Sequence, residues 1–383
     1  MTKTSRRAVL KGLGASLLAA PMINKGVVAY GPMAWQSIST KAVDLVDGSL
    51  VIDGLSVMRP LNNLFPKTPT DDTMALSDDH IAKLRETGTT VWHPAVGLGG
   101  PNVRETVYRF FAQLNARVAE RPDVFMRITS AADLATVKAS GKIGVILGVQ
   151  NSDHFQSVND VNAFHQIGQR ISQLTYNSQN RIGSGSTDRI DGGISNDGAA
   201  IVARMNEVGM AVDVSHCGDQ TTLDAFELSK KPAVITHSNV RALAGGHVRC
   251  KSDDALKAVA KAGSVMGITG VRMFVREQEP TNLNHLLDHY DYVRDMAGIE
   301  HVGIGSDMDP DGYDDRDKPY KDALTANYDP KYGFRDKIDT DGFDSPKKVY
   351  HLVDGMLARG YTDDHIRMVL GQNFQRVLSD IWG

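Results

Sequence analysis

Three short apolar runs decide the fold of this 383-residue chain: MAVDVSH (210–216), PAVITHS (232–238) and HVGIGSD (301–307). Each run is rich in Val and Ile and carries, at or next to its end, a histidine or an aspartate. In a barrel of parallel strands the carboxyl ends of all strands meet at one mouth. We therefore expect these polar ends to converge, in a pattern that is typical of the scaffold of a metal-dependent hydrolase.

Five further runs of the same kind accompany these three. Amphipathic stretches separate them, and several open on Ser, Asp or Asn and close on Gly, which are start and stop signals of helices. Eight strand–helix units with continuous apolar strands predict an α/β fold, a closed (β/α)8 TIM barrel. The rival is a doubly wound open sheet, which the lack of a Gly-rich phosphate fingerprint after the first strand disfavours. The further strand runs are 49–53, 89–94, 142–150, 170–177 and 263–270, and the helical stretches include 77–88, 102–120, 196–209, 219–231 and 252–263.

The composition is that of an ordinary globular protein, with 41% hydrophobic and 23% charged residues. A barrel of ~250 residues or more fits into this length without a second core. The formal net charge of −4 argues against a nucleic-acid partner, which requires a basic patch. Two cysteines, Cys217 and Cys250, allow at most one internal disulfide.

The N-terminus has the pattern of an export signal. Arg6 and Arg7 precede the apolar stretch 12–23, which is shorter than the ~18 residues that span a bilayer. Paired arginines before a weakly hydrophobic segment are typical of the twin-arginine route for folded proteins, and a basic tail before a core helix is the alternative. We therefore expect a leader over 1–35, one domain over 36–383, the twin-arginine machinery as a partner, and a periplasmic protein that is membrane-associated if the leader is not cleaved.

The segment 309–345 interrupts the alternation of strands and helices. It is crowded with Asp, Tyr, Gly and Pro and shows no periodicity, which predicts a long solvated loop after the last strand. In a barrel such a loop leaves from the catalytic face, where substrate selectivity resides. Its acidic clusters suggest a calcium loop as the alternative, but they lack the EF-hand spacing. The tail segments 345–360 and 362–378 predict two closing helices.

His216 and His237 stand 21 residues apart, which is the length of one strand–helix unit. Imidazoles from neighbouring strand ends can both reach one divalent metal at ~2.0–2.1 Å. The alternative is a structural hydrogen-bonding role, although a neighbouring serine in both cases favours the metal. Asp307 follows the last strand, where a carboxylate can accept a proton from water or donate one to a leaving amine. For Asp307 the alternative is a role in forming the turn SDMDPDG.

A long block of the chain carries family-specific segments in a fixed order. These are LTYNSQN (174–180), GSGSTDRIDGGIS (183–195), AVDVSHCGDQTT (211–222), PAVITHSNVRAL (232–243) and VRCKSDD (248–254). Together they resemble the membrane (renal-type) dipeptidases, the zinc peptidase family M19 of the amidohydrolase-like barrels. The resemblance covers roughly residues 44–378. It implies a (β/α)8 barrel with two bridged zinc ions that hydrolyses a dipeptide, and it suggests a homodimer.

Several functional residues of that family have counterparts here. The resemblance assigns the two later zinc-ligand histidines to His216 and His237, and the acid of the eighth strand to Asp307. It assigns the basic residue that faces the substrate carboxylate to Arg249, and a substrate-binding asparagine after the fourth strand to Asn180.

Other family positions depart from the pattern. The first-strand motif D-G-H-x-D reads DGLSV at 53–57, so Leu55 and Val57 replace two metal ligands. The bridging glutamate falls on Gln150, and the histidine that polarises the scissile carbonyl falls on Tyr176. The first metal position therefore has no anionic ligand and is expected to be empty.

These departures lead us to expect one zinc ion rather than two, held by His216 and His237 with Gln150 as a weak, neutral ligand or Asp307 as the alternative ligand. His93, at the end of the second strand run, is a candidate extra ligand, and a core role is its alternative. Tyr176 is expected to donate to a developing oxyanion. The sequence thus predicts an exported dipeptidase-like hydrolase that cleaves an amide bond in a dipeptide or related small carboxylate. The alternatives are a metal-poor tailoring enzyme acting on a modified peptide and a non-catalytic protein that binds a small molecule.

Overall fold

The computed structural model describes residues 38–383 apart from 59–76, 317 and 327. The described residues belong to one compact unit. The expected leader, residues 1–35, lies outside them. No helix among the described residues is both long enough and apolar enough to cross a membrane.

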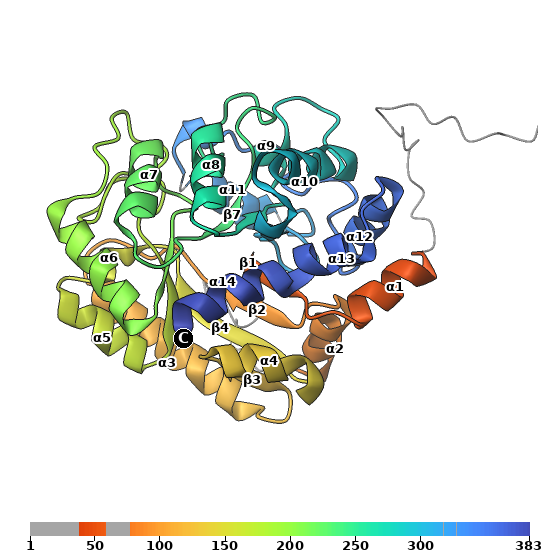
Figure 1. The fold of residues 1–383 in the computed structure, drawn as a ribbon, viewed down its shortest axis with the longest axis horizontal. Helices are drawn as coiled ribbons and strands as arrows, with labels where there is room; N and C mark the ends of the chain where they lie inside the picture. Colours follow the sequence, from red (N-terminus) through yellow and green to blue (C-terminus); the bar gives the residue numbers. More distant parts are fainter. Residues whose placement is uncertain (1–37, 59–76, 317, 327) are drawn as a thin grey trace, which may run out of the picture. The chain divides into compact units, whose positions relative to one another are not determined.

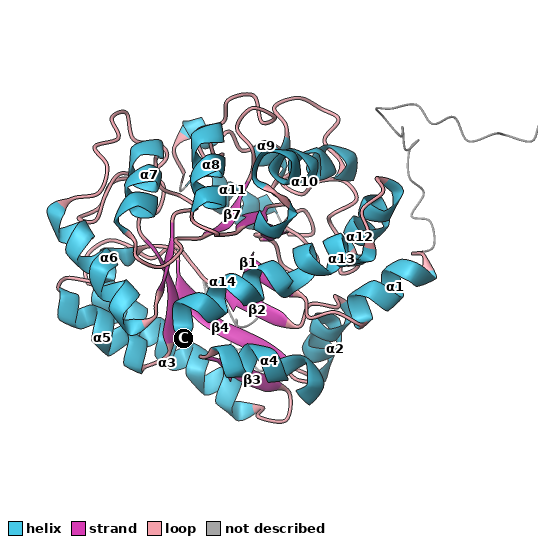
Figure 2. Cartoon of the chain, in the orientation of Figure 1, coloured by secondary structure: helices cyan, strands magenta, loops and turns pink. Residues whose placement is uncertain are grey.

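The centre of the fold is a barrel of parallel strands surrounded by helices (Figure 2). The strands of the described residues are β1 (Ile52–Ser56), β2 (Val91–Pro94), β3 (Phe125–Ile128), β4 (Ile143–Val149), β5 (Gln169–Gln173), β6 (Ala211–Asp213), β7 (Ile235–Ser238), β8 (Met266–Ile268) and β9 (Val302–Ile304). Eight of them form the barrel in the order β6-β5-β4-β2-β1-β9-β8-β7, and their ladders are all parallel. A parallel bridge between Asp213 and Val234 joins the two ends of this order. The predicted (β/α)8 barrel is confirmed, and its eight strands overlap the eight predicted runs.

The ninth strand, β3, was not predicted. It pairs only with β4, outside the path of the barrel, and helix α4 (Ala131–Ser140) follows it. Its burial pattern exposes Arg127 and half-buries Met126, so its four residues lack the continuous apolar character of a barrel strand. Because it is an edge strand beside the first half of β4, partly open to solvent, its sequence gives a weaker strand signal than the barrel strands do.

The amino-terminal end of the barrel is closed by the last helix, α14 (Asn373–Trp382), which contacts β1, β6 and β9 (Figure 1). Phe374, Val377, Leu378 and Ile381 lie on one face of α14, since they are spaced at i, i+3, i+4 and i+7. These side chains form one buried cluster with apolar residues at or near the starts of the barrel strands, among them Ile52. The apolar plug at this end leaves the opposite end of the barrel for polar side chains.

Three of the predicted helices begin on a serine cap within one residue of the predicted start. Ser77, Ser195 and Ser252 each accept a hydrogen bond from the backbone N–H three residues ahead, and Gly209 ends its helix with a left-handed φ of 73°. The second tail helix is divided, because a π-helical turn at Met368–Gln372 precedes α14. The remaining helices of the described residues are α1 (Thr40–Asp47), α2 (Asp78–Glu86), α3 (Val103–Glu120), α5 (Val158–Gln166), α6 (Asn196–Val208), α7 (Asp219–Leu228), α8 (Asp253–Lys261), α9 (Arg272–Val275), α10 (Leu283–Ala297), α11 (Lys318–Ala326), α12 (Lys348–Ala358) and α13 (Asp363–Arg367).

The segment 309–345 is more ordered than the predicted solvated loop. It contains α11 and a short 3-10 helix, Pro330–Tyr332. Its acidic residues bind backbone within the segment: Asp339 accepts from the N–H groups of Tyr313 and Asp314, and Asp314 accepts from that of Asp339. The prediction failed because these carboxylates, which read as solvated charges, serve as internal acceptors for backbone donors.

The close approach of Gly305, which follows β9, to Thr236 of β7 yields a test of the barrel. A methyl group added at Gly305 would lie 1.9 Å from the carbonyl oxygen of Thr236, which is backbone and cannot move aside freely. We expect Gly305→Ala to lower the free energy of unfolding by about 2–3 kcal/mol. Gly192→Ala is the matched control, because the nearest atom to its added carbon is 4.0 Å away. Equal urea midpoints for the two variants would contradict this packing.

Candidate functional site

The polar strand ends converge at the carboxyl end of the barrel as the sequence predicts. Gln150 follows β4, Tyr176 lies three residues beyond β5, His216 lies three residues beyond β6, His237 belongs to β7, and Asp307 lies three residues beyond β9. A cavity of about 670 Å³ opens there, and Gln150, Tyr176 and Asp307 line it. A cavity of this size accommodates a small ligand.

The two histidines lie together beneath this cavity. Nε2 of His216 is 2.9 Å from Nε2 of His237, and the side chains are 1% and 0% exposed. Burial lowers the pKa of both imidazoles well below its usual value, and the positive charge of Arg249 adds to this effect. Both rings are therefore neutral at neutral pH.

The hydrogen-bond network fixes which nitrogen of each ring carries the proton. Nδ1 of His216 lies 2.6 Å from Oδ1 of Asn177, an acceptor, so it must donate. Nδ1 of His237 lies 2.9 Å from Oγ1 of Thr236, whose own proton goes to the carboxylate of Asp213 at 2.6 Å. With both Nδ1 atoms protonated, the two Nε2 atoms present lone pairs to each other.

Two facing lone pairs at 2.9 Å are unfavourable unless a cation or a shared proton lies near them. Two Nε2 ligands on a tetrahedral zinc stand about 3.3 Å apart, given Zn–N distances of ~2.0–2.1 Å. The two Nε2 atoms of His216 and His237 would therefore fit a zinc ion if the two rings moved slightly apart. Within the described part of the chain, no group of three or more His, Cys, Asp or Glu side chains could hold a metal.

The positions that would complete a larger metal site are apolar or neutral. Leu55 is fully buried and Val57 lines the cavity, and hydrocarbon side chains cannot bind a metal. Gln150 donates from its side-chain nitrogen to the carbonyl of Ala95 at 3.0 Å, so its side-chain oxygen is the atom that a metal would use. This residue could supply a neutral third ligand.

Tyr176 covers the ring of His216. Its ring stacks on the ring of His216, with centroids 4.3 Å apart and an interplanar angle of 25°. The other side of the ring packs against Gly97, where an added methyl group would lie 2.6 Å from a ring atom. The Tyr176 hydroxyl shares a 2.7 Å hydrogen bond with that of Tyr328. The segment 309–345 is thereby linked to the ring that separates the cavity from His216.

Asp307 has a strained backbone and a perturbed carboxyl group. Its φ is +56°, which is uncommon for a residue other than glycine, and its N–H donates to the carbonyl of Leu55 at 2.9 Å. Burial raises the pKa of Asp307 to about 7; Arg249 opposes this rise and Asp53 adds to it. A carboxyl group that titrates near 7 can both accept and donate a proton at neutral pH.

Arg249 lies behind the cavity wall rather than in it. Its side chain is 1% exposed, and it donates to the carbonyl oxygens of Ser215 and His237 and to Oγ of Ser238. The guanidinium therefore holds the backbone next to both histidines in place. The contact with a substrate carboxylate that the resemblance assigns to Arg249 stays a prediction.

Asn180 and His93 also lie apart from the cavity lining. Asn180 uses its amide to order the loop after β5, donating to Asn151 and to the carbonyl of Leu174 and accepting from the N–H of Ile182. Its role in substrate binding stays a prediction. His93 is 1% exposed and pairs its Nδ1 with the carbonyl of Gly54 at 2.6 Å, while its buried Nε2 has no hydrogen-bond partner in the described structure.

The sequence reasoning did not identify three residues of this site. Asn177, Thr236 and Asp213 fix the tautomers of the two histidines, and each lies next to a residue that was singled out or within the same run. The available signal was their polar character inside apolar strand runs, because a polar residue in a barrel interior requires a partner.

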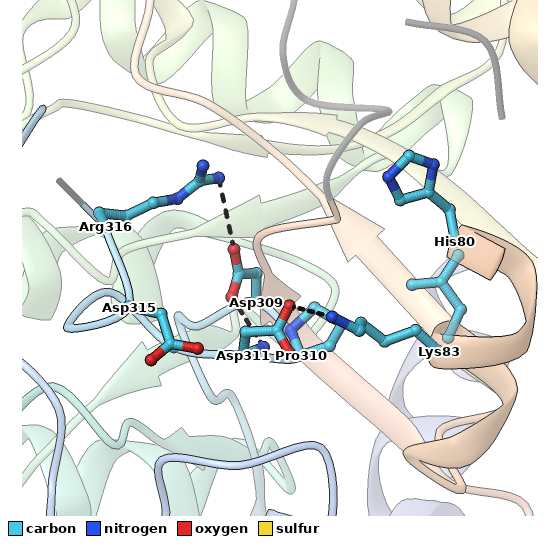
Figure 3. Close-up of a pocket in the computed structure, with 9 residues that line it drawn as sticks. His80, Lys83, Asp309, Pro310, Asp311, Asp315 and Arg316 are labelled. Carbon is cyan, nitrogen blue, oxygen red and sulfur yellow. Dashed lines mark hydrogen bonds and ion pairs between the residues drawn. The ribbon is translucent and has the colours of Figure 1, made fainter. Parts of the chain in front are cut away.

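A second, smaller cavity of about 330 Å³ lies beside α2 and the start of segment 309–345 (Figure 3). Lys83 pairs with Asp311 at 2.7 Å, and Arg316 lies 3.8 Å from Asp309. Since these charges pair within the cavity and no strand-end residue singled out above lines it, we assign the candidate active site to the larger cavity.

The barrel and its strand-end histidines are those of an amidohydrolase-like metal-dependent hydrolase. The profile of the membrane dipeptidases, peptidase family M19, matches residues 40–327. The chain therefore belongs to this family.

Similar proteins agree with this assignment. Dipeptidase verJ of Clonostachys rogersoniana is 31% identical over 255 residues, which make up 66% of this chain and 59% of that protein. The chain thus spans about three-fifths of the length of this relative. An amidohydrolase from Pseudomonas aeruginosa has a TM-score of 0.76 and 28% identity, over 89% of this chain and 99% of that one. A metallo peptidase from Rhodobacter sphaeroides, liganded with a phosphinate mimic of the dipeptide L-Ala-D-Ala, shares the fold, with a TM-score of 0.72 and 19% identity over 87% of this chain and 100% of that one.

The hydrogen bond that Nδ1 of His237 donates to the hydroxyl of Thr236 can be tested by metal affinity. We expect Thr236→Val to weaken zinc binding about 10- to 100-fold, because His237 loses the acceptor that fixes its tautomer. Thr236→Ser keeps the hydroxyl and should bind zinc as the natural protein does. The measurement is a competition titration with a chelating dye, and ¹⁵N NMR of the imidazoles in zinc-free protein reports the tautomer. Unchanged affinity and unchanged tautomer in the Val variant would contradict the role of Thr236.

The buried carboxyl group of Asp53 makes stability depend on pH. Burial raises the pKa of Asp53 to about 6 from 3.8, despite two hydrogen bonds from Ser306. Because the folded-state pKa is the higher one, ionisation favours the unfolded chain, and stability falls as the pH rises from about 4 through 6. We expect Asp53→Asn to gain about 2–3 kcal/mol relative to the natural protein between pH 4 and pH 7.

Urea unfolding at several pH values measures how steeply the free energy of unfolding depends on pH in the natural protein and in the Asn variant. The loss of hydrogen bonds in the Asn variant is independent of pH and shifts the curve without tilting it. Asp364→Asn, whose side chain is 89% exposed, controls for the removal of one negative charge. Parallel pH profiles for natural protein and Asp53→Asn would contradict the raised pKa.

Proposed function

We propose that this protein is a dipeptidase-like hydrolase that cleaves an amide bond in a small peptide, with a single zinc ion held by His216 and His237. The observation that supports this most directly is the pair of Nε2 lone pairs that face each other at 2.9 Å beneath the cavity. Zinc, when bound, supplies a Lewis acid that polarises a carbonyl and makes water more acidic. A single ion is proposed because Leu55 and Val57 offer no ligand atoms.

Asp307 is the proposed proton carrier. It lines the cavity, and a pKa near 7 suits it to take a proton from the attacking water and to pass one to the leaving amine. Tyr176 also lines the cavity and has a hydroxyl that can turn from Tyr328 towards a developing oxyanion. Gln150 is proposed as a neutral ligand or as a hydrogen-bonding group for the substrate.

A second candidate function is a protein that binds or tailors a small molecule without metal. The stacking of Tyr176 on His216 favours it, because this ring lies between the cavity and the histidine. Tyr176 would have to move before a substrate could approach a metal on the histidine pair. The two functions differ in whether zinc is bound.

We also propose that the protein is exported in the folded state by the twin-arginine route and acts in the periplasm. The support is the paired Arg6 and Arg7 before the apolar stretch 12–23. Folded export suits a hydrolase that acquires its metal before it crosses the membrane.

Metal analysis tests the hydrolase. We expect about one zinc per chain in protein purified without chelator, and none in the double variant His216→Ala/His237→Ala, because the two imidazoles supply the donor pair. Mass spectrometry of the metal content gives the result. Zinc in equal amount in both proteins, or in neither, would contradict the zinc hydrolase, and the second result would favour metal-free binding or tailoring.

Asp307→Asn is the matched variant that separates catalysis from zinc binding. It should keep the zinc and lower kcat for a cleaved peptide by 100-fold or more, since general acid–base catalysis contributes about 10²–10⁴-fold. Loss of the zinc in this variant would show that Asp307 acts as a ligand instead.

A further inference from the structure

The charges around the cavity are unusual for a site that would bind dipeptides. Among the described residues that line it, Asp307 and Asp329 carry formal charge, and none is a lysine, arginine or histidine. Lys331 lies near the rim, where it donates to the carbonyl of Thr187 at 3.1 Å, and it does not line the cavity. A cavity wall with negative charge and no cation attracts an amine and repels a carboxylate.

Arg249 is a cation buried behind the cavity wall. Arg249 is 1% exposed and donates to the carbonyl of His237 at 2.9 Å and to Oγ of Ser238 at 3.3 Å. Its guanidinium carbon lies 5.6 Å from the ring centroid of Phe274, and Phe274 itself lines the cavity. Since Nε of Arg249 has no hydrogen-bond partner among the described residues, a substrate carboxylate could reach Arg249 without breaking these bonds, but only if the aromatic wall moved aside.

The wall in front of Arg249 is aromatic and tightly packed. Ring centroids lie 5.2 Å apart for Phe274 and Tyr332, 4.7 Å for Tyr328 and Tyr332, and 5.3 Å for Tyr332 and Phe334. All four of these residues line the cavity. Such a wall favours a bulky apolar or aromatic group on the ligand.

We propose that this cavity selects peptide-like substrates that carry a free amine and an aromatic or bulky apolar side chain, and whose carboxyl end is blocked as an amide or ester. The amine lies towards the carboxylates of Asp307 and Asp329, and the side chain packs on the wall formed by Phe274, Tyr328, Tyr332 and Phe334. This substrate class rests on the proposed hydrolase function, and it differs from a dipeptide with a free carboxylate.

Asp329 is the residue through which the amine preference can be tested separately. It lies at the rim, is exposed, and caps the short 3-10 helix by accepting from the N–H of Lys331 at 2.8 Å. Asparagine can cap a helix equally well, so Asp329→Asn removes the charge and keeps the local structure.

The experiment is isothermal titration calorimetry on the full chain after removal of metal, at pH 7.5, with three ligands that differ in one end group. Phenylalanyl-phenylalaninamide should bind at least tenfold more tightly than phenylalanyl-phenylalanine, whose free carboxylate meets the negative wall. N-acetyl-phenylalanyl-phenylalaninamide, which lacks the amine, should also bind at least tenfold more weakly. Alanyl-alaninamide, which lacks both rings, should bind weakly too.

The Asp329→Asn variant completes the design. It should bind phenylalanyl-phenylalaninamide about three- to tenfold more weakly than the natural protein does, and the acetylated ligand with unchanged affinity. Equal or tighter binding of the free dipeptide, or an unchanged affinity of the variant for the amine ligand, would overturn the proposed substrate class. Because the protein in this titration is free of metal, these results do not depend on zinc content or turnover. Absence of zinc would contradict the hydrolase alone, and tighter binding of the free dipeptide would contradict the substrate class alone.

Discussion

The buried carboxylate of Asp213 connects the closure of the barrel to the geometry of the site. It accepts hydrogen bonds from the backbone N–H and hydroxyl of Ser215 and from the backbone N–H and hydroxyl of Thr236. These bonds join β6 to β7, where the strand order of the barrel closes on itself. Because the Thr236 hydroxyl gives its proton to Asp213, it must accept from His237, and this fixes the lone pair of His237 towards His216. One carboxylate, at 1% exposure, therefore holds both the closure of the barrel and the orientation of the facing Nε2 atoms of His216 and His237.

The rest of the mouth surrounds the two histidines with apolar and neutral groups. Leu55 is fully buried, Val57 lines the cavity, and Gln150 offers a neutral amide. Burying hydrocarbon and a neutral amide costs less than burying unpaired carboxylates, and the ring of Tyr176 stacks on His216. The described lining of the cavity is therefore rich in apolar and aromatic groups, with Asp307 and Asp329 as its charged members.

Local patterns made much of the fold predictable. The barrel strands and the helices with serine caps were readable because burial on both faces and capping leave direct traces in a few adjacent residues. Strand β3 was missed because it is an edge strand that pairs only with β4 and lacks a continuous apolar run. Helix α11 was missed because the aspartates around it read as solvated charge, whereas in the fold Asp314 and Asp339 accept hydrogen bonds from each other's backbone.

The sequence by itself determined the (β/α)8 barrel and the gathering of His216, His237 and Asp307 at one mouth, since equivalent strand ends of a closed parallel barrel must meet there. It also determined that Leu55, Val57 and Gln150 stand where the family resemblance places metal ligands, because that requires only the identity of the residues. Tertiary structure alone decided which atoms face each other. The protonation of the two histidines, the burial of Arg249 behind Phe274 and the cover of Tyr176 over His216 depend on contacts between segments distant in the chain, which no local pattern records.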